Sequence, residues 1–185
     1  MISDIMDEAE LKMDDAIEYT KEEFAAIRTG RAHPAMFSKL TAEYYGVQTP
    51  IQQLATIQIP EARMVLIAPF DRGAMSAIEK AVRDADLGVN PSNDGNAIRI
   101  VLPELTAERR KEYTKLAKTK AEDARVSVRN SRRQAKEAID KLVKDGDVGE
   151  DEAARAEKAL DALTRKHTDV IDELLKNKEA ELLEV

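Results

Sequence analysis

All six prolines of this chain lie between positions 34 and 103. Proline interrupts a helix because it lacks a backbone N–H and its ring clashes with the preceding turn. Long helices can therefore form only on either side of this segment. Small and apolar side chains do recur there at steps of three and four, over residues 6–27, 113–142 and 153–174. The pattern predicts three long amphipathic helices packed as an elongated antiparallel bundle.

The proline-containing segment, residues 31–104, has a different character. One helical stretch is expected at 73–88, and β-like runs occur at 40–47, 54–59, 64–70 and 97–103. We therefore predict an α+β protein, in which a small α/β domain of the βαβ type (31–104) is inserted into a three-helix bundle (1–30 and 105–185). Because only two segments of chain join the domains, their junction is a natural hinge.

Composition excludes several classes of site. The chain has no cysteine, so disulfides and thiolate metal sites are absent. His167 falls on a predicted buried stripe, and we expect a core or boundary histidine. No nucleophile stands near a base at usable spacing, so we predict neither an enzyme nor a cofactor. The longest apolar run, MVLIAPF at 64–70, is too short to span a bilayer, and the acidic N-terminus lacks a secretory signal; we expect a cytoplasmic protein.

Charge is distributed unevenly along the chain. The formal net charge is −7, yet residues 106–144 carry 13 bases and 6 acids, whereas 1–27 and 145–185 are both strongly acidic. At 100° per residue, several of these bases lie within about 40° of Arg125 and about a quarter turn from the buried stripe. They form what we call the basic ridge: Lys118, Arg125, Arg129, Arg132 and Lys136, with Arg133 to one side.

Two interpretations of the basic ridge remain open. Most charged helix faces are solvated and paired with neighbouring helices, here the two acidic ones. The ridge is unusual because no acid lies near its centre and arginine outnumbers lysine there. The planar guanidinium fork suits phosphate, so the second interpretation is a nucleic-acid surface whose binding is sensitive to salt.

Six stretches, taken together and in order, resemble the bacterial ribosome recycling factor family over the whole chain. They are IRTGRAHPAMF (27–37), YYGVQTPIQQLATI (44–57), DLGVNPSNDGNAIRI (86–100), LPELTAERRKEY (102–113), VSVRNSRRQAK (126–136) and KEAELLEV (178–185). The resemblance implies an L-shaped protein with a three-helix bundle as its long arm and an inserted domain on a flexible hinge as its short arm.

The resemblance also assigns roles to residues. It implies that Arg129 and Arg132 in VRNSRR, and Arg110 in ERRK, contact ribosomal RNA, and that Arg28 and Arg31 in RTGR are basic residues near the hinge.

The hinge itself maps to Gly30 and Arg31 on one strand of chain and to Glu104, Leu105 and Thr106 on the other. Within the insert, Tyr44-Tyr45-Gly46 is expected to serve turn and packing rather than to form a base-stacking platform, and contact with a partner GTPase is a further alternative.

The function that the resemblance implies is ribosome recycling. The protein would bind the post-termination ribosome on large-subunit rRNA, and elongation factor G would use GTP to drive separation of the subunits. We expect a monomer without a cofactor of its own or a membrane partner. Two rivals remain: a general RNA- or DNA-binding coiled-coil protein, and a structural bundle whose ridge pairs with acidic helices in an oligomer.

Overall fold

The computed structural model describes residues 1–184. They form two compact units, one from Met1–Phe24 and Lys115–Glu179, the other from Ala25–Thr114 and the residues after Glu179. The division falls inside three long helices, so the ends of these helices belong to the second unit. The predicted insert, 31–104, lies within the second unit, and its boundaries stay a prediction.

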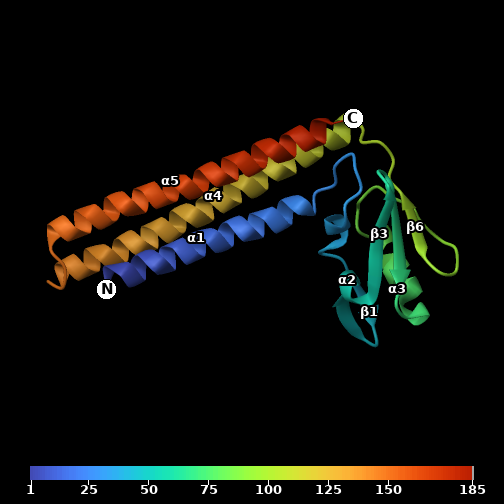
Figure 1. Cartoon of the computed structure of the whole chain (residues 1–185), viewed down its shortest axis with the longest axis horizontal. Helices are drawn as coiled ribbons and strands as arrows, with labels where there is room; N and C mark the ends of the chain where they lie inside the picture. Colours follow the sequence, from blue (N-terminus) through green and yellow to red (C-terminus); the bar gives the residue numbers. More distant parts are fainter. Residues whose placement is uncertain (185) are drawn as a thin grey trace. The chain divides into compact units, whose positions relative to one another are not determined.

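The first unit is a bundle of three helices. They are α1 (Ile2–Ala25), α4 (Ala107–Lys144) and α5 (Glu150–Leu183), and they lie side by side along this unit (Figure 1). Local chemistry sets the helix ends. Thr106 caps α4, because its Oγ1 accepts from the Arg109 N–H at 3.1 Å.

The turn between α4 and α5 follows from one glycine. Gly146 adopts a φ of 79°, its N–H donates to the Val143 carbonyl at 3.0 Å, and the next N–H, of Asp147, donates to Leu142 at 2.9 Å. This pair of bonds is the Schellman arrangement, which ends a helix where a left-handed residue is available. α5 then begins with three acids in its first turn, where the helix dipole favours negative charge.

Small residues dominate the seam of the bundle. The stripe predicted on α4 is buried as expected: Ala117, Ala121, Ala124, Val128, Ser131, Ala135 and Ile139. Larger side chains from the neighbouring helices fill the space beside them, and Met13, Leu160 and Ile171 are fully buried. The periodicity of the sequence therefore located the core of this unit correctly.

His167 is a core histidine, as predicted, with 3% of its surface exposed. Its Nδ1 lies 2.7 Å from the Leu163 carbonyl and its Nε2 lies 2.6 Å from Asp14 Oδ1. Because a carbonyl oxygen only accepts, Nδ1 carries a proton. The residue joins α5 to α1 through a polar contact inside the seam.

The second unit contains two antiparallel sheets. The hairpin β1 (Thr41–Tyr44) and β2 (Val47–Pro50) stands alone. A four-stranded sheet has the order β3-β4-β6-β5, with bounds Ala55–Glu61, Met64–Pro69, Ile98–Val101 and Pro91–Asn93. The expected strand–helix–strand order is present, with β4 before the helix and β5 and β6 after it, but β4 and β6 pair antiparallel, as do β5 and β6.

Helix α3 (Met75–Arg83) supplies the core of this unit together with the sheet. Alternate residues of the central strands are fully buried, Val65 and Ile67 on β4 and Ile98 and Ile100 on β6. Short helical turns complete the unit: η1 (Pro34–Phe37), α2 (Ile51–Leu54) and η2 (Arg72–Ala74).

The run 40–47, predicted as one strand, is instead a strand and a turn. Tyr45 and Gly46 have φ values of 49° and 77°, which is the geometry of a tight hairpin turn. Tyr44 anchors the hairpin, because its hydroxyl donates to Asp71 Oδ2 at 2.7 Å. Tyr45 packs edge-on against Tyr44, with ring centroids 4.5 Å apart, and its side chain is 85% exposed.

The hydrogen bond to Asp71 raises the pKa of Tyr44 to about 12 from 10.0. Since the folded pKa exceeds the unfolded one, this bond contributes stability below pH 10 that is lost as the pH rises through about 12. We predict that the difference in ultraviolet titration between wild type and Tyr44→Phe has its midpoint near 12, and that Asp71→Asn lowers this midpoint. A midpoint near 10 in wild type would contradict the bond.

Candidate nucleic-acid interface

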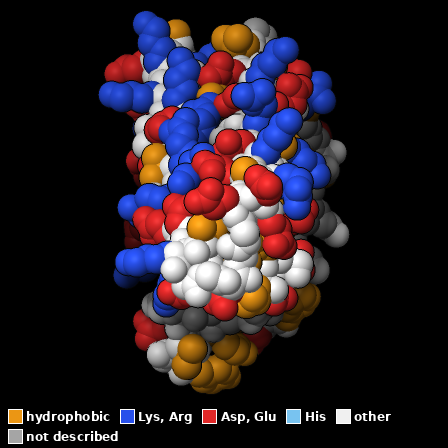
Figure 2. Space-filling view, turned by 90° about the vertical axis from the view of Figure 1, so that its left-hand side faces the viewer, with side chains coloured by type: hydrophobic (Ala, Val, Ile, Leu, Met, Phe, Trp, Pro, Cys, Tyr) orange, Lys and Arg blue, Asp and Glu red, His pale blue; other side chains and the backbone are white. Residues whose placement is uncertain are grey.

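The basic ridge lies on the outer side of α4, and acidic side chains of α5 contact it. Figure 2, in which the left-hand side of Figure 1 faces the viewer, shows lysine and arginine side chains interspersed with aspartate and glutamate on that side of the molecule. Arg129 and Arg133 are exposed, whereas Arg125 and Arg132 are partly covered. The ridge is thus a mixed surface whose arginines differ in accessibility.

Two arginines of the ridge are held by α5. Arg132 donates from Nε to Asp161 Oδ1 at 2.7 Å and from Nη2 to the same oxygen at 2.6 Å. Arg125 does the same with Asp172 Oδ1, at 2.8 Å and 2.7 Å. These contacts join residues that are far apart in the sequence, so the spacing on α4 alone could not reveal them.

Other acids meet the ridge along α4 itself. Glu122 accepts from Arg125 at 3.2 Å and from Arg129 at 3.3 Å. Lys136 donates to Asp140 at 2.9 Å, and this hydrogen bond is the main cause that raises the pKa of Lys136. The interpretation of a face paired with acidic neighbours is therefore correct for these bases in the free protein.

Pairing does not remove the ridge as a binding surface. Exposed ion pairs of this kind contribute only about 0–1 kcal/mol, because water already solvates both partners. A phosphate can therefore replace a carboxylate at modest cost. Within residues 1–184, Lys118 and Arg133 form no ion pair and remain open for contact.

Among the residues predicted to contact RNA, Arg28 is the one whose position agrees least with a role on the surface. It is 4% exposed, and its guanidinium donates to the backbone carbonyls of Leu87, at 3.2 Å, and Pro103. Burial lowers the pKa of Arg28. The side chain therefore ties the segment after α1 to two distant loops of its own unit, and we leave it out of the proposed RNA contacts.

Arg31 and Arg110 differ from Arg28. Arg31 is exposed, so it is accessible to a partner. Arg110 is half-buried in the first turns of α4, and its Nε is buried without a hydrogen-bond partner. Arg28 Nε is buried without a partner in the same way, so this atom does not distinguish the two arginines. Arg110 differs from Arg28 in its partial exposure, which leaves part of its side chain accessible to a partner.

The chain segments predicted as a hinge are tied to the β3–β4 turn. Ala32 N–H donates to the Ala62 carbonyl and Leu102 N–H to the Arg63 carbonyl, both at 2.7 Å. Arg63 also pairs with Glu104 at 3.5 Å. Gly30 lies between the Ala32 bond and the end of α1.

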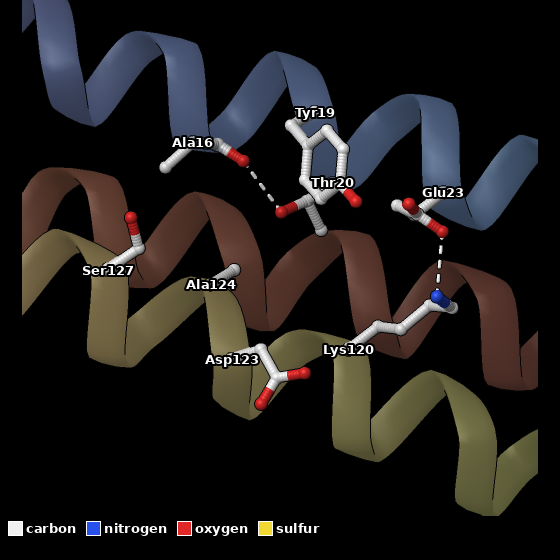
Figure 3. Close-up of a pocket in the computed structure, with 8 residues that line it drawn as sticks. All are labelled: Ala16, Tyr19, Thr20, Glu23, Lys120, Asp123, Ala124 and Ser127. Carbon is white, nitrogen blue, oxygen red and sulfur yellow. Dashed lines mark hydrogen bonds and ion pairs between the residues drawn. The ribbon is translucent and has the colours of Figure 1, made fainter.

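Sequence reasoning missed a polar pair between α1 and α4. Lys120 Nζ donates to Glu23 at 2.7 Å, and the Glu23 side chain is only 6% exposed (Figure 3). The sequence could have indicated a buried acid here, since Glu23 lies three residues after Thr20 on the buried stripe of α1. The pair borders a hollow of about 220 Å³ lined by Ala16, Tyr19, Thr20, Glu23, Lys120, Asp123, Ala124 and Ser127.

Neither a metal cluster nor a membrane span occurs in the described part of the chain. Among residues 1–184, no group of three or more His, Cys, Asp or Glu side chains could hold a metal ion. Over the same residues, no helix is long and apolar enough to cross a membrane.

The fold and the ridge together define a helix-bundle protein whose candidate site is a charged helix face, not a pocket. A family model described as the ribosome recycling factor matches residues 20–183. The chain belongs to the ribosome recycling factor family. Ribosome-recycling factors from Kineococcus radiotolerans and Thermobifida fusca are 69% and 65% identical to it over 185 residues, 100% of each chain.

Solved structures agree with this assignment. A solution structure of the ribosome recycling factor is 46% identical, with a TM-score of 0.78 over 100% of this chain and 98% of that chain. A second similar chain, 40% identical with a TM-score of 0.69 and full coverage of both chains, comes from models for the T. thermophilus ribosome recycling factor and the E. coli elongation factor G bound to the E. coli post-termination complex.

The burial of Arg28 leads to a stability prediction. Arg28→Met leaves the carbonyls of Leu87 and Pro103 without donors, so we expect the second unit to lose about 2 kcal/mol or more. Amide hydrogen exchange at Val65 and Ile100 measures this loss. Arg31→Met, at an exposed position, is the control and should change exchange little. Equal protection in Arg28→Met and wild type would show that the buried guanidinium stabilises nothing.

Proposed function

We propose that this protein acts as a ribosome recycling factor, in keeping with the family to which it belongs. It binds the post-termination ribosome on large-subunit rRNA and, with elongation factor G and GTP, promotes dissociation into subunits for a new round of translation. The observation that carries this proposal is full-length similarity to recycling factors, one of which is described together with elongation factor G on a post-termination complex.

Several finer statements belong to the same proposal. The protein works as a cytoplasmic monomer, has no catalytic activity and needs no cofactor of its own. The energy for subunit separation comes from GTP bound by elongation factor G. Support comes from the family, whose members are translation factors.

The basic ridge is the proposed grip on rRNA. Lys118, Arg129 and Arg133 are its exposed members, and Arg125, Arg132 and Lys136 lie partly covered beside acids of α5. Arg110 and Arg31 are proposed as further contacts. Phosphate oxygens would take the place of carboxylate oxygens on the arginines, and the release of counterions would make binding sensitive to salt.

The acidic remainder of the protein makes this grip selective. Residues 1–27 and 145–185 are strongly acidic, and they contribute α1 and α5 of the bundle. Their charge repels the RNA backbone, so other faces bind poorly and the ridge alone is attractive. An acidic protein with one arginine-rich face is thereby oriented on a polyanion instead of being held to it at random.

Mechanically, the helices suit a rod that transmits force. We propose that elongation factor G pushes on the inserted domain, that the bundle carries the load to the rRNA contact, and that the chain bends at Gly30, Arg31 and the stretch Glu104–Thr106. The backbone bonds of Ala32 and Leu102 to the β3–β4 turn support this placement, because they hold both strands of chain just beyond the hinge.

The contact for elongation factor G is proposed at exposed apolar side chains of the second unit. Tyr45, Val47 and Phe70 are 85%, 63% and 69% exposed. Tyr45 also holds a left-handed φ of 49°, which is unfavourable for a tyrosine. Backbone strain of this kind persists where function requires the side chain.

The first test of the proposal is light scattering from post-termination ribosomes mixed with this protein, elongation factor G from the same organism and GTP. Scattering should fall only when all three are present, and Arg132→Ala should slow the fall about tenfold or more, because one phosphate contact is lost. Arg155→Ala is the matched control, since Arg155 is exposed on α5 away from the ridge.

The outcomes separate the rivals. No change in scattering with the intact protein would overturn recycling, and binding to any nucleic-acid duplex would then favour the general coiled-coil protein. A dimer without ribosome affinity would favour the structural bundle. A variant Arg132→Ala that splits ribosomes normally would show that the grip lies elsewhere.

The exposed tyrosine gives a second test. Tyr45→Asn removes the aromatic ring while asparagine tolerates the left-handed backbone, so the hairpin is kept. We expect the concentration of elongation factor G required for half-maximal splitting to rise about threefold to tenfold, with unchanged affinity for the large subunit. Tyr45→Phe should behave like wild type. An unchanged requirement in Tyr45→Asn would remove the hairpin from the contact.

A further inference from the structure

We propose that Asp161 and Asp172 of α5 are positioning residues for the arginines that contact RNA. Each carboxylate holds one edge of a guanidinium group on α4. The remaining N–H groups of Arg132 are left available for phosphate, whereas Nη1 of Arg125 also donates to Glu122 at 3.2 Å. This inference rests on the proposed function, because it concerns how the ridge is prepared for rRNA.

The geometry shows how each arginine is held. In both pairs a single oxygen, Oδ1, accepts from Nε and from Nη2 of the same guanidinium, at 2.6–2.8 Å. An arginine has five N–H donors in a rigid fork. The contact therefore occupies one side of the fork and sets the direction of the rest. For Arg132, no hydrogen bond to Nη1 occurs within residues 1–184, and 32% of its side chain is exposed.

The spacing of the partners shows that α5 sets where the guanidinium groups lie. Arg125 and Arg132 are seven residues apart on α4, which is roughly 10.5 Å along the helix. Their partners Asp172 and Asp161 are eleven residues apart on α5, roughly 16.5 Å. The side chains of the two pairs span this difference of roughly 6 Å, so the positions of the acids on α5 contribute to where the two guanidinium groups lie.

The other arginines of the ridge lack this support. Arg129 reaches only Glu122, on its own helix, through one bond of 3.3 Å, and 57% of its side chain is exposed. Arg133 forms no ion pair within residues 1–184. The ridge thus combines two arginines that are held by α5 with two exposed arginines that are not, and the held pair is the part that is preorganised for binding.

Two opposing effects determine how Asp161 and Asp172 change the affinity of the ridge for RNA. A held arginine has already lost much of its rotamer freedom, so less is lost when phosphate binds. A nearby carboxylate also repels phosphate, which weakens binding. Asparagine separates the two effects, because its Oδ1 accepts the same hydrogen bonds without the charge. Alanine removes both the charge and the acceptor.

The test is the dissociation constant of the full-length protein for vacant large ribosomal subunits, measured by pelleting at fixed salt. We expect Asp161→Ala and Asp172→Ala to weaken binding about threefold to tenfold, although each makes the protein less acidic. Asp161→Asn and Asp172→Asn should bind at least as tightly as wild type. Asp169→Ala, an exposed acid on the same helix, is the matched control for charge and should not weaken binding.

A double-mutant cycle adds a measurement that distinguishes action through Arg132 from a purely structural role of Asp161. If Asp161 acts through Arg132, then Asp161→Ala has no further effect on affinity once Arg132→Ala is present. Circular dichroism melting verifies that all variants are folded, which is expected because exposed pairs contribute little to stability.

Each result has one meaning. Alanine variants that bind as tightly as wild type, or more tightly, would show that the acids only screen the ridge and would overturn the proposal. Asparagine variants as weak as the alanine variants would overturn it too, because orientation by an acceptor would then not be the cause. If wild type itself fails to bind large subunits, the proposed function fails instead.

Discussion

The close packing of α4 against its neighbours is the constraint on which the charged surface depends. The buried stripe of α4 is built largely from alanine, including Ala117, Ala121 and Ala124. Alanine has little bulk, so helices with such a seam can approach closely. Close approach brings carboxylates of α5 within 2.6–2.8 Å of guanidinium groups on α4. With bulkier residues in the seam, the ridge would stand apart from α5 and its arginines would be unsupported.

The same acids therefore have two effects on one surface. On α5 as a whole they give the bundle a negative potential that discourages binding of RNA to the wrong face. At Asp161 and Asp172 they hold arginines of the face that we propose to contact RNA. An acidic protein that must bind a polyanion in one orientation gains from this arrangement, because attraction is confined to a small and prepared region.

In the second unit, hydrogen bonds hold in place the two segments of chain that join the predicted insert to the long helices. Arg28 fastens the segment that follows α1 to carbonyls at Leu87 and Pro103, and the β3–β4 turn fastens Ala32 and Leu102. Each contact satisfies backbone groups that would otherwise be left without a partner. Gly30 lies between these contacts and α1, where the hinge is proposed. A buried arginine thus serves the proposed hinge, although its sequence motif drew attention to it as a surface base.

Local pattern alone determined the three long helices, the buried stripe of α4 and the position of His167, because helical periodicity records which side of a helix is covered. The six ordered motifs were likewise sufficient to indicate the family. Pattern failed at one local turn and where partners are distant in the chain. The run 40–47 is a strand and a turn because Tyr45 and Gly46 adopt positive φ. Strands β4 and β6, which are separated in the chain by α3, pair antiparallel. The ion pairs of Arg125 and Arg132 depend on the register of α4 against α5, and that register is decided only when three helices pack together.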